Sequence, residues 1–537
     1  MKSSKKIIAA LLSLITIISH MGGVLFTEVK AASASAPLVY IYGEHNVYVR
    51  QEDGSWFNPR DTYDNEIISE SVPELLPLFA KALVTNDYGE WSEAALEKLS
   101  PIYADIKPSP DGTVPENTFV EGHWDKVNLA TDYGPLGSFY NYIWDMRLSP
   151  LDFTEDLHNY IETVKARTGS DKIVLASRCG GAALMAAYLT QYGYDDIEKA
   201  IFFCNNLFGF NHADLTLSGK ITVNGEAFDR WLNYEDKLAG FGLDEELYKF
   251  LMAMISALDS NGSVQDVADT VMKVYDKIKD PFIAPFLREY FGICGGYVAN
   301  VGDNYEAYRD YIFPTDELKE EYSAILSKAD DFHYNVQLKA EDLLKEMDEN
   351  GVPVYMLANY GEQMVAFGEK SSWLSDVDAP VFEQSFGATT CKTAQTLTDE
   401  YIASREDAGF GKYISPDRQI DASTGLFPER TFYIKNLRHD YYSDSAEYAV
   451  QKVAYTPDLT IDTLADFPQF LTCDKDLKTV TPAKAVNDAD IDWSAYDEQN
   501  KLDGAEGLAV RLIAFFAKVF SVFRQMILKI SSLFKVG

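Results

Sequence analysis

The chain has 537 residues, of which 47% are hydrophobic, so it can bury a sizeable core as one large domain with insertions or as several smaller domains. Its 83 acidic and 47 basic side chains give a formal net charge of −36. Such an acidic surface repels phosphates, which excludes nucleic acids as expected partners, and otherwise indicates a soluble, solvated surface.

The N-terminus has the pattern of a secretory signal. Lys2, Lys5 and Lys6 precede an uncharged stretch over 7–27, and Val29 and Ala31 have the spacing of a signal-peptidase site. We therefore expect residues 1–31 to be a signal peptide and the mature chain to act outside the cytoplasm, secreted or held at the membrane or cell surface. An uncleaved membrane anchor is the alternative, because the stretch is nearly long enough to span a bilayer.

Cysteines are few, and no cofactor is indicated. The five cysteines (Cys179, Cys204, Cys294, Cys391 and Cys473) lack metal-ligand spacing, and so few in a chain of this size do not form a disulfide scaffold. Because their number is odd, at least one thiol is left for other chemistry, and Cys179 is a candidate. The sequence contains no CxxC, HExxH, Walker A or GxGxxG motif, so neither a metal nor a nucleotide cofactor is expected.

Strand and helix patterns alternate in the first part of the chain. Apolar runs predict strands within 36–46, 137–150, 172–176 and 199–204. Helices are predicted from the apolar residues Leu157, Tyr160, Ile161 and Val164, with a stop at Gly169, and again over 180–193. The alternation predicts an α/β fold with a mostly parallel central sheet flanked by helices, and residues 32–218 form its first part.

The stretch 219–349 is different, because it contains amphipathic helix patterns with no strand between them. We interpret it as a helical lid inserted into the sheet domain, with a separate helical domain as the alternative. Strand patterns return at 352–361 and 429–442, so residues 350–455 are expected to complete the sheet. Residues 456–506 are polar and acidic, and they are predicted to be a linker.

The C-terminal segment 507–537 contains no acidic residue. Its five basic residues are Arg511, Lys518, Arg524, Lys529 and Lys535. On a helical wheel most of them lie opposite an aromatic and aliphatic face, which is typical of a helix lying in a membrane interface rather than spanning a bilayer. The alternative is a helix docked on the protein's own core or on another copy.

A nucleophile elbow is predicted within DKIVLASRCGGAALMAAYL, where a strand meets a helix at small residues. In such a turn the residues two before and two after the nucleophile must be small. Centring the turn on Ser177 places a leucine at one flank, and centring it on Arg178 offers no nucleophile. Centring it on Cys179 gives Ser177 and Gly181 as flanks, so we predict Cys179 as the nucleophile. The positive end of the following helix favours its thiolate. The alternative is a small buried cysteine without chemistry.

The other groups of the site should follow in the order nucleophile, acid, histidine. Only His212, His333 and His439 lie downstream of Cys179, and His439 directly follows a predicted strand. Asp417 lies 22 residues before His439, and Asp421 competes with it as the acid that orients the imidazole.

An oxyanion hole needs two donors near the nucleophile. The backbone N–H of Gly180 is the first candidate, because it directly follows Cys179. The second donor is expected in the turn after the first strand, near Glu44.

Together these residues resemble the lecithin:cholesterol acyltransferase-like branch of the α/β-hydrolases, over roughly 36–215 and 350–445. WDMR at 144–147 is similar to the YDWR-like segment of that branch, and SRCGGA at 177–182 matches its GHSMGG elbow without a gap. PDRQIDAS at 416–423 resembles its acid loop, and LRH ends at His439. The resemblance implies an α/β-hydrolase fold with a helical lid and a triad of Cys179, Asp417 and His439.

The chain departs from that branch at the elbow. Cysteine replaces the usual serine, as in the dienelactone-hydrolase-like branch, while Arg178 replaces a histidine and Ser177 a glycine. The leading expectation is a secreted, membrane-associated esterase, lipase or acyltransferase that acts on acyl-ester or lipid-like substrates through an acyl-enzyme. The alternative is a non-catalytic surface binding protein that keeps the fold as a scaffold.

Overall fold

The computed structural model describes residues 36–43, 46–123, 129, 131–225, 227–228, 230, 264–439, 443–474 and 476–485. The chain divides into a short N-terminal unit, Met1–Ala36, and a second unit, Pro37–Gly537, which contains every element named below. The predicted signal peptide and the C-terminal segment 507–537 lie outside the described residues.

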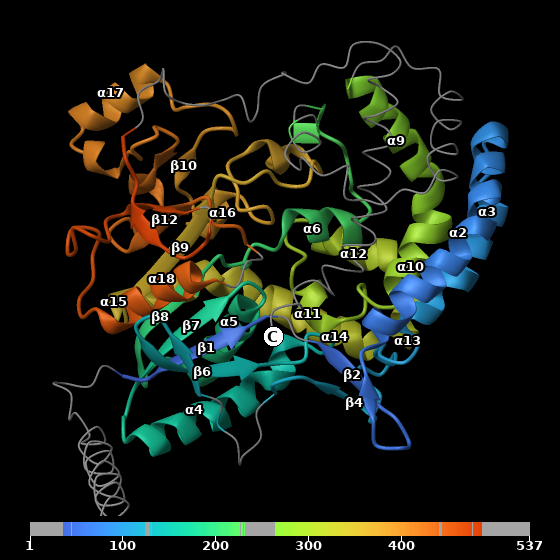
Figure 1. Ribbon diagram of the computed structural model, residues 1–537, viewed down its shortest axis with the longest axis horizontal. Helices are drawn as coiled ribbons and strands as arrows, with labels where there is room; N and C mark the ends of the chain where they lie inside the picture. The colour runs from blue at the N-terminus through green and yellow to red at the C-terminus, as the bar shows by residue number, and fades with distance from the viewer. Residues whose placement is uncertain are drawn as a thin grey trace, which may run out of the picture. The chain divides into compact units, whose positions relative to one another are not determined.

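A nine-stranded sheet forms the centre of the second unit, in the order β14-β13-β12-β9-β8-β7-β1-β6-β5 (Figure 1). The strands from β13 to β6 run parallel, and an antiparallel strand closes each edge. The strands are β1 (Leu38–Tyr42), β5 (Thr131–Gly134), β6 (Gly137–Ile143), β7 (Ile173–Arg178), β8 (Ile197–Phe203), β9 (Val354–Tyr360), β12 (Thr431–Lys435), β13 (Phe470–Cys473) and β14 (Val480–Pro482). The predicted mostly parallel sheet is confirmed.

The helices surround this sheet and extend to one side of it. They are α2 (Pro59–Thr85), α3 (Gly89–Leu99), α4 (Thr154–Thr168), α5 (Gly181–Tyr192), α6 (Asn211–Leu217), α9 (Val264–Ile278), α10 (Ala284–Arg288), α11 (Gly295–Val298), α12 (Tyr305–Ile312), α13 (Asp316–Glu321), α14 (Ser323–Asn335), α15 (Ala340–Glu349), α16 (Val381–Gln384), α17 (Asp399–Asp407) and α18 (Asp444–Tyr455). Two small sheets pair β2 (Val47–Arg50) with β3 (Trp56–Phe57) and β4 (Thr118–Val120), and β10 (Thr389–Thr390) with β11 (Ile420–Asp421).

The central strands are apolar because helices cover both faces of the sheet. Every residue of β1, β7 and β9 is buried, as expected for parallel strands inside a layered fold. Along β8, Ala200 and Phe202 join the cluster under α5, while the Lys199 ammonium donates to the Val453 and Thr456 carbonyls at the end of α18. Because neighbouring strand residues point to opposite faces, α5 and α18 pack on opposite sides of the sheet.

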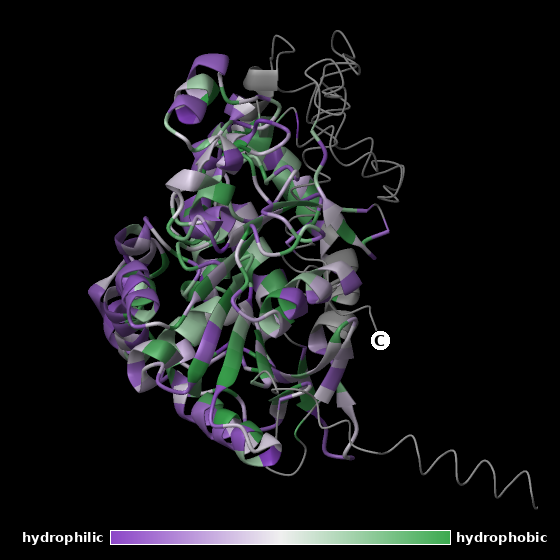
Figure 2. Ribbon diagram, turned by 90° about the vertical axis from the view of Figure 1, so that its left-hand side faces the viewer, coloured by the Kyte–Doolittle hydropathy of each residue, from purple (hydrophilic) through white to green (hydrophobic). Residues whose placement is uncertain are grey.

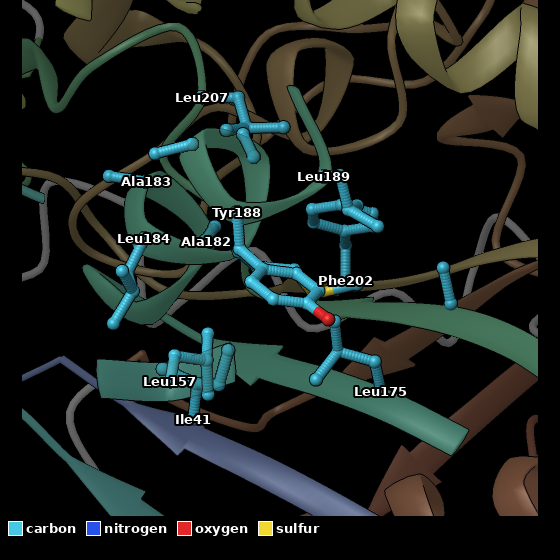
Figure 3. Close-up of a cluster of buried hydrophobic side chains, with 14 of the residues drawn as sticks. Ile41, Leu157, Leu175, Ala182, Ala183, Leu184, Tyr188, Leu189, Phe202 and Leu207 are labelled. Carbon is cyan, nitrogen blue, oxygen red and sulfur yellow. The ribbon is translucent and has the colours of Figure 1, made fainter. Parts of the chain in front are cut away.

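The helix α5 is the centre of the largest cluster around the predicted elbow. Its residues from Gly181 to Leu189 are all buried. Figure 3 shows this helix above the strands, with Tyr188 and Leu189 lying near Leu175 of β7 and Phe202 of β8. Full burial of each large apolar side chain contributes about 1.5–3 kcal/mol, so this packing holds the start of α5 firmly against the sheet.

A second hydrophobic cluster lies outside the sheet. It joins α3, from the first part of the chain, to helices of the predicted insertion, through residues such as Trp91, Phe282 and Tyr308. Figure 1 shows α2, α3, α9 and α10 grouped beside the sheet, and in Figure 2 the central strands are green while the outer helices carry purple faces. Within the described part of 219–349 the regular elements are helical, as the sequence predicts. Helices from 59–99 belong to the same cluster, which the sequence did not indicate.

The predicted linker needs correction. Residues 456–485 complete the sheet through β13 and β14, and Phe467 is fully buried against Phe432. The acidic composition concealed these short strands, because edge strands need few apolar residues. No helix in the described part of the chain has the length and apolar character needed to cross a bilayer.

Candidate active site

Four chemically reactive side chains lie just beyond the carboxyl ends of adjacent strands. Cys179 follows β7, Cys204 follows β8, Asp376 lies in the connection after β9, and His439 follows β12. In open α/β sheets, ligands bind outside this edge of the strands. The sheet order thus brings together residues that are 260 positions apart in the sequence, from 179 to 439.

The turn at Cys179 is a strained strand-to-helix junction. Cys179 has a φ of 51°, in the left-handed region that non-glycine residues rarely adopt. A Cβ atom added to Gly181 would lie 2.4 Å from the Ile41 carbonyl oxygen, and one added to Gly43 would lie 2.6 Å from the Gly180 nitrogen. The close approach of these backbones explains the glycines, and the Cys179 side chain remains partly exposed.

His439 is paired with Asp376. The distance from its Nδ1 to the Asp376 Oδ2 is 2.8 Å, and its backbone N–H donates to the Asp376 carbonyl over 2.9 Å. The two residues are 2% and 0% exposed. With Nδ1–H donated to the carboxylate, Nε2 is left available for proton transfer, and it has no hydrogen-bond partner among the described residues.

The carboxylate itself is fixed by a tight turn. Its Oδ1 accepts hydrogen bonds from the backbone N–H groups of Asp378 and Ala379, over 3.1 and 2.9 Å. Between them Val377 has a φ of 98°, which is a strained conformation for a β-branched residue. Strain of this kind collects where function requires a particular geometry.

Arg178 and Phe210 hold the histidine from two further sides. The buried Arg178 guanidinium donates from Nη2 to the His439 carbonyl oxygen over 2.8 Å. The ring of Phe210 meets the imidazole edge to face, with 4.9 Å between centroids. The arginine beside Cys179 is therefore part of the scaffold that positions His439.

The charges around His439 favour its protonated form. Burial alone lowers the pKa of His439, but the negative charges of Cys204 and Asp376, and then of Cys179, raise it, as does the hydrogen bond to Asp376. The net effect is a His439 pKa well above the usual 6.5 of a histidine. An imidazolium that is paired with a carboxylate and lies near a cysteine can stabilise the thiolate form of that cysteine for attack.

The two predicted acids, Asp417 and Asp421, bind other side chains than His439. The assignment of Asp417 as the triad acid is therefore wrong. Its carboxylate accepts from Ser415 Oγ at 2.7 Å, Lys435 Nζ at 2.8 Å and Tyr360 O–H at 3.1 Å, and it makes no hydrogen bond with His439. Asp421 accepts from Arg405 Nε at 2.7 Å. Both carboxylates are occupied by structural donors, and Asp376 takes the place beside the histidine.

The other two downstream histidines, His333 and His212, have partners of their own. The His333 ring stacks on Tyr305, and its Nδ1 contacts Gln337 Oε1, far along the chain in the insertion. His212 lies 3.7 Å from Asp378 through its Nδ1. Gly180 directly precedes α5, while Glu44 lies outside the described residues, so the predicted oxyanion donors stay a prediction.

Sequence reasoning missed Asp376 and Cys204. Both Asp376 and Asp417 lie between β9 and β12, so chain order does not distinguish them, but SDVDAP follows β9 more closely. Cys204 ends the predicted strand KAIFFC, and this position at the carboxyl end of a parallel strand was a signal that it lies at the site. Ligand atoms of Cys204, Asp376 and His439 lie within 4.8 Å of one another, a donor set that could also hold a metal ion such as zinc.

Comparisons with known proteins add little. No family model matches this chain, and no curated protein matches it in sequence. Among solved structures, the chain is similar to one in "The crystal structure of Tle4-Tli4 complex", with 10% identity over 90% of this chain and 100% of that chain. The TM-score of 0.24 is too low to indicate a shared function, so the site's own geometry has to carry the assignment.

Proposed function

We propose that this protein is an acyl hydrolase or acyltransferase with an α/β-hydrolase fold and a Cys179–His439–Asp376 triad. The observation that carries the proposal is the meeting of a strained cysteine turn with a buried histidine–carboxylate pair at the carboxyl edge of one sheet. The chain order nucleophile, acid, histidine is that of α/β-hydrolases. With Asp376 in place of Asp417 as the triad acid, the other residues that resemble the lecithin:cholesterol acyltransferase-like branch keep the roles that the resemblance implies.

The chemistry follows from the roles of the three groups. The Cys179 thiolate attacks the acyl carbonyl, and the His439 imidazolium gives its Nε2 proton to the departing alkoxide. Water or an acceptor alcohol then gives up a proton to Nε2 as it attacks the thioester, and the C–S bond breaks, which releases the acyl group and restores the thiolate–imidazolium pair. Asp376 keeps the imidazole in the tautomer that these transfers need.

The oxyanion is stabilised at the start of α5. Gly180 directly precedes the buried helix α5, so its N–H and the positive end of the helix are the donors that we assign to the developing negative charge. The second donor comes from the turn after β1, near Glu44, and the tight approach of Gly43 to the Gly180 nitrogen supports this location.

The substrate is an ester or thioester with an apolar, lipid-like acyl group, and the enzyme acts outside the cytoplasm at a membrane or cell surface. The leader-like pattern of 1–31 supports secretion, and the basic, aromatic segment 507–537 supports contact with a membrane interface. The helices of 219–349 act as the lid over the acyl site.

Trapping of the acyl-enzyme tests this function. The full chain is mixed with p-nitrophenyl esters of increasing acyl length, quenched in acid and mapped by mass spectrometry. We expect the acyl group on Cys179, no adduct in Cys179→Ala, and normal acylation in Cys391→Ser, whose hydroxyl can keep the bond that the Cys391 thiol makes to the Gln395 carbonyl. A folded protein that forms no adduct with any ester or thioester would favour the non-catalytic scaffold.

A further inference from the structure

We propose that Cys179 and Cys204 form a reversible disulfide when the protein meets a peroxide, so that Cys204 serves as the resolving thiol for the nucleophile. Cys204 is fully buried and has no step of its own in the acyl transfer described above. The effect on activity rests on the proposed function, but formation of the disulfide does not.

The register of the sheet places the two cysteines opposite each other. The parallel strands β7 and β8 are paired up to Arg178 and Phe203, and the Cys179 N–H donates to the Phe203 carbonyl oxygen at 3.3 Å. Cys179 and Cys204 are therefore the next pair in register. Neighbouring strands lie about 4.8 Å apart, which falls within the range of about 4.4–6.8 Å between the Cα atoms of a disulfide.

Cys204 lies close to the imidazole on which the charge of Cys179 also acts. The Cys204 Sγ, an Asp376 oxygen and a His439 ring nitrogen lie within 4.8 Å of one another, and the charge of Cys179 acts on the same ring. Both cysteines leave their strands with positive φ, 51° for Cys179 and 39° for Cys204. The two side chains thus start from matching backbone turns, and the charges of both act on one imidazole.

The chemistry balances with hydrogen peroxide as oxidant. The Cys179 thiolate displaces hydroxide from the peroxide, which gives a sulfenic acid, and the hydroxide takes up the proton of the thiol as water. The Cys204 sulfur then attacks the Cys179 sulfur, the S–O bond breaks, and a second water leaves with the Cys204 proton. Two thiols are oxidised by two electrons, one peroxide is reduced to two waters, and a dithiol reductant reverses the change.

Two of the other cysteines, Cys391 and Cys473, are poorly placed for this reaction. Burial raises the pKa of the Cys391 thiol to about 12, so it stays protonated and unreactive near neutral pH. Cys473 belongs to β13, which is separated from β8 in the sheet by β12 and β9. These two residues provide matched controls within the same chain.

Peptide mapping after oxidation tests the proposal on the full chain. The protein is treated with hydrogen peroxide, its remaining thiols are blocked with iodoacetamide, and disulfide-linked peptides are identified before and after dithiothreitol. We expect a Cys179–Cys204 link that dithiothreitol removes, with return of Cys179 labelling. The Cys391→Ser variant should behave in the same way.

Variants that lack the resolving thiol of Cys204 test the same proposal from the other side, because the disulfide cannot form in them. In Cys204→Ala or Cys204→Ser, Cys179 should instead gain two oxygens as a sulfinic acid, which dithiothreitol does not reverse. The proposal is overturned if the wild type accumulates the same sulfinic acid as these variants without a link, or if Cys179 pairs with another cysteine. Because the readout is a peptide mass, its failure is distinct from a failure to form the acyl-enzyme.

Discussion

Asp376 and Asp417 are both buried acids in the connection between β9 and β12, yet only one of them touches the histidine. Asp376 meets His439 at Nδ1 and is held by two backbone N–H groups. Asp417 instead holds Lys435 and Tyr360 at the ends of their strands. Local contacts, rather than burial or residue type, distinguish the acid proposed for catalysis from the structural one.

Amide substitution at these two positions separates the roles. Asp376→Asn should lower kcat/KM by about 10²–10⁴, because the amide favours the wrong tautomer of His439. Asp417→Asn should leave kcat/KM close to the wild-type value and lower the free energy of unfolding by about 1 kcal/mol, since the partly exposed Lys435 loses a charged partner that water replaces only in part. Ester hydrolysis and thermal unfolding measure the two effects. The reverse pattern, with activity lost only in Asp417→Asn, would restore Asp417 as the acid.

At the scale of single elements, the contact between β1 and α5 sets the geometry of the elbow. Gly181→Ala would place a methyl group 2.4 Å from the Ile41 carbonyl oxygen, which neither backbone can easily yield. We expect a loss of about 1–3 kcal/mol or more in stability and a fall in kcat, because the Gly180 N–H moves with the start of α5. Thermal unfolding and ester hydrolysis would report both losses.

The matched control for that substitution is Gly89→Ala at the start of α3. An added Cβ there meets only the Asp87 Oδ1 at 3.5 Å, an ordinary contact. It should leave stability unchanged or raise it slightly through helix propensity. Equal effects of the two substitutions would show that the β1–α5 contact is not tight.

The sequence predicts strands and helices that have a continuous apolar pattern. It does not predict features that depend on contacts between residues distant in the chain. The runs that form β1, β7, β8 and β9, and the helix after Cys179, were predictable because buried parallel strands and a buried helix need continuous apolar residues. The strand β13 was not, because a short strand near the sheet edge resembles a loop. The carboxylate partner of His439 could not be predicted from the sequence either, because both Asp376 and Asp417 lie in the β9–β12 connection and satisfy the chain order.

At the scale of the whole molecule, helices distant in sequence share one hydrophobic cluster. Trp91 of α3 packs against Phe282, and Tyr103 stacks on Tyr290. The predicted insertion is thereby anchored to residues from the first part of the chain. Such anchoring limits how far these helices can move relative to the first part of the chain.

The C-terminal segment gives a prediction at this scale. A chain that ends at Gly504 should bind vesicles containing phosphatidylserine more weakly than the full chain, because about 1 kcal/mol of attraction per basic residue is lost with the apolar face. A full chain with Lys518→Glu and Arg524→Glu, which keeps that face, should fall between them and lose the salt dependence in part. Sedimentation with vesicles measures the binding. Equal binding by all three chains would assign the segment to a protein contact instead.

The rate of Cys179 alkylation against pH tests the central claim most directly. Because the pKa of His439 is raised, its imidazolium persists above pH 6.5 and stabilises a thiolate where an ordinary thiol, with a pKa of about 8.5, is protonated. Iodoacetamide should therefore label Cys179 rapidly near pH 6–7 in the wild type. His439→Ala should slow the labelling by about 10-fold or more there, and the difference should vanish as pH rises above about 8.5. An ordinary thiol profile in the wild type, unchanged by His439→Ala, would contradict a histidine-activated nucleophile.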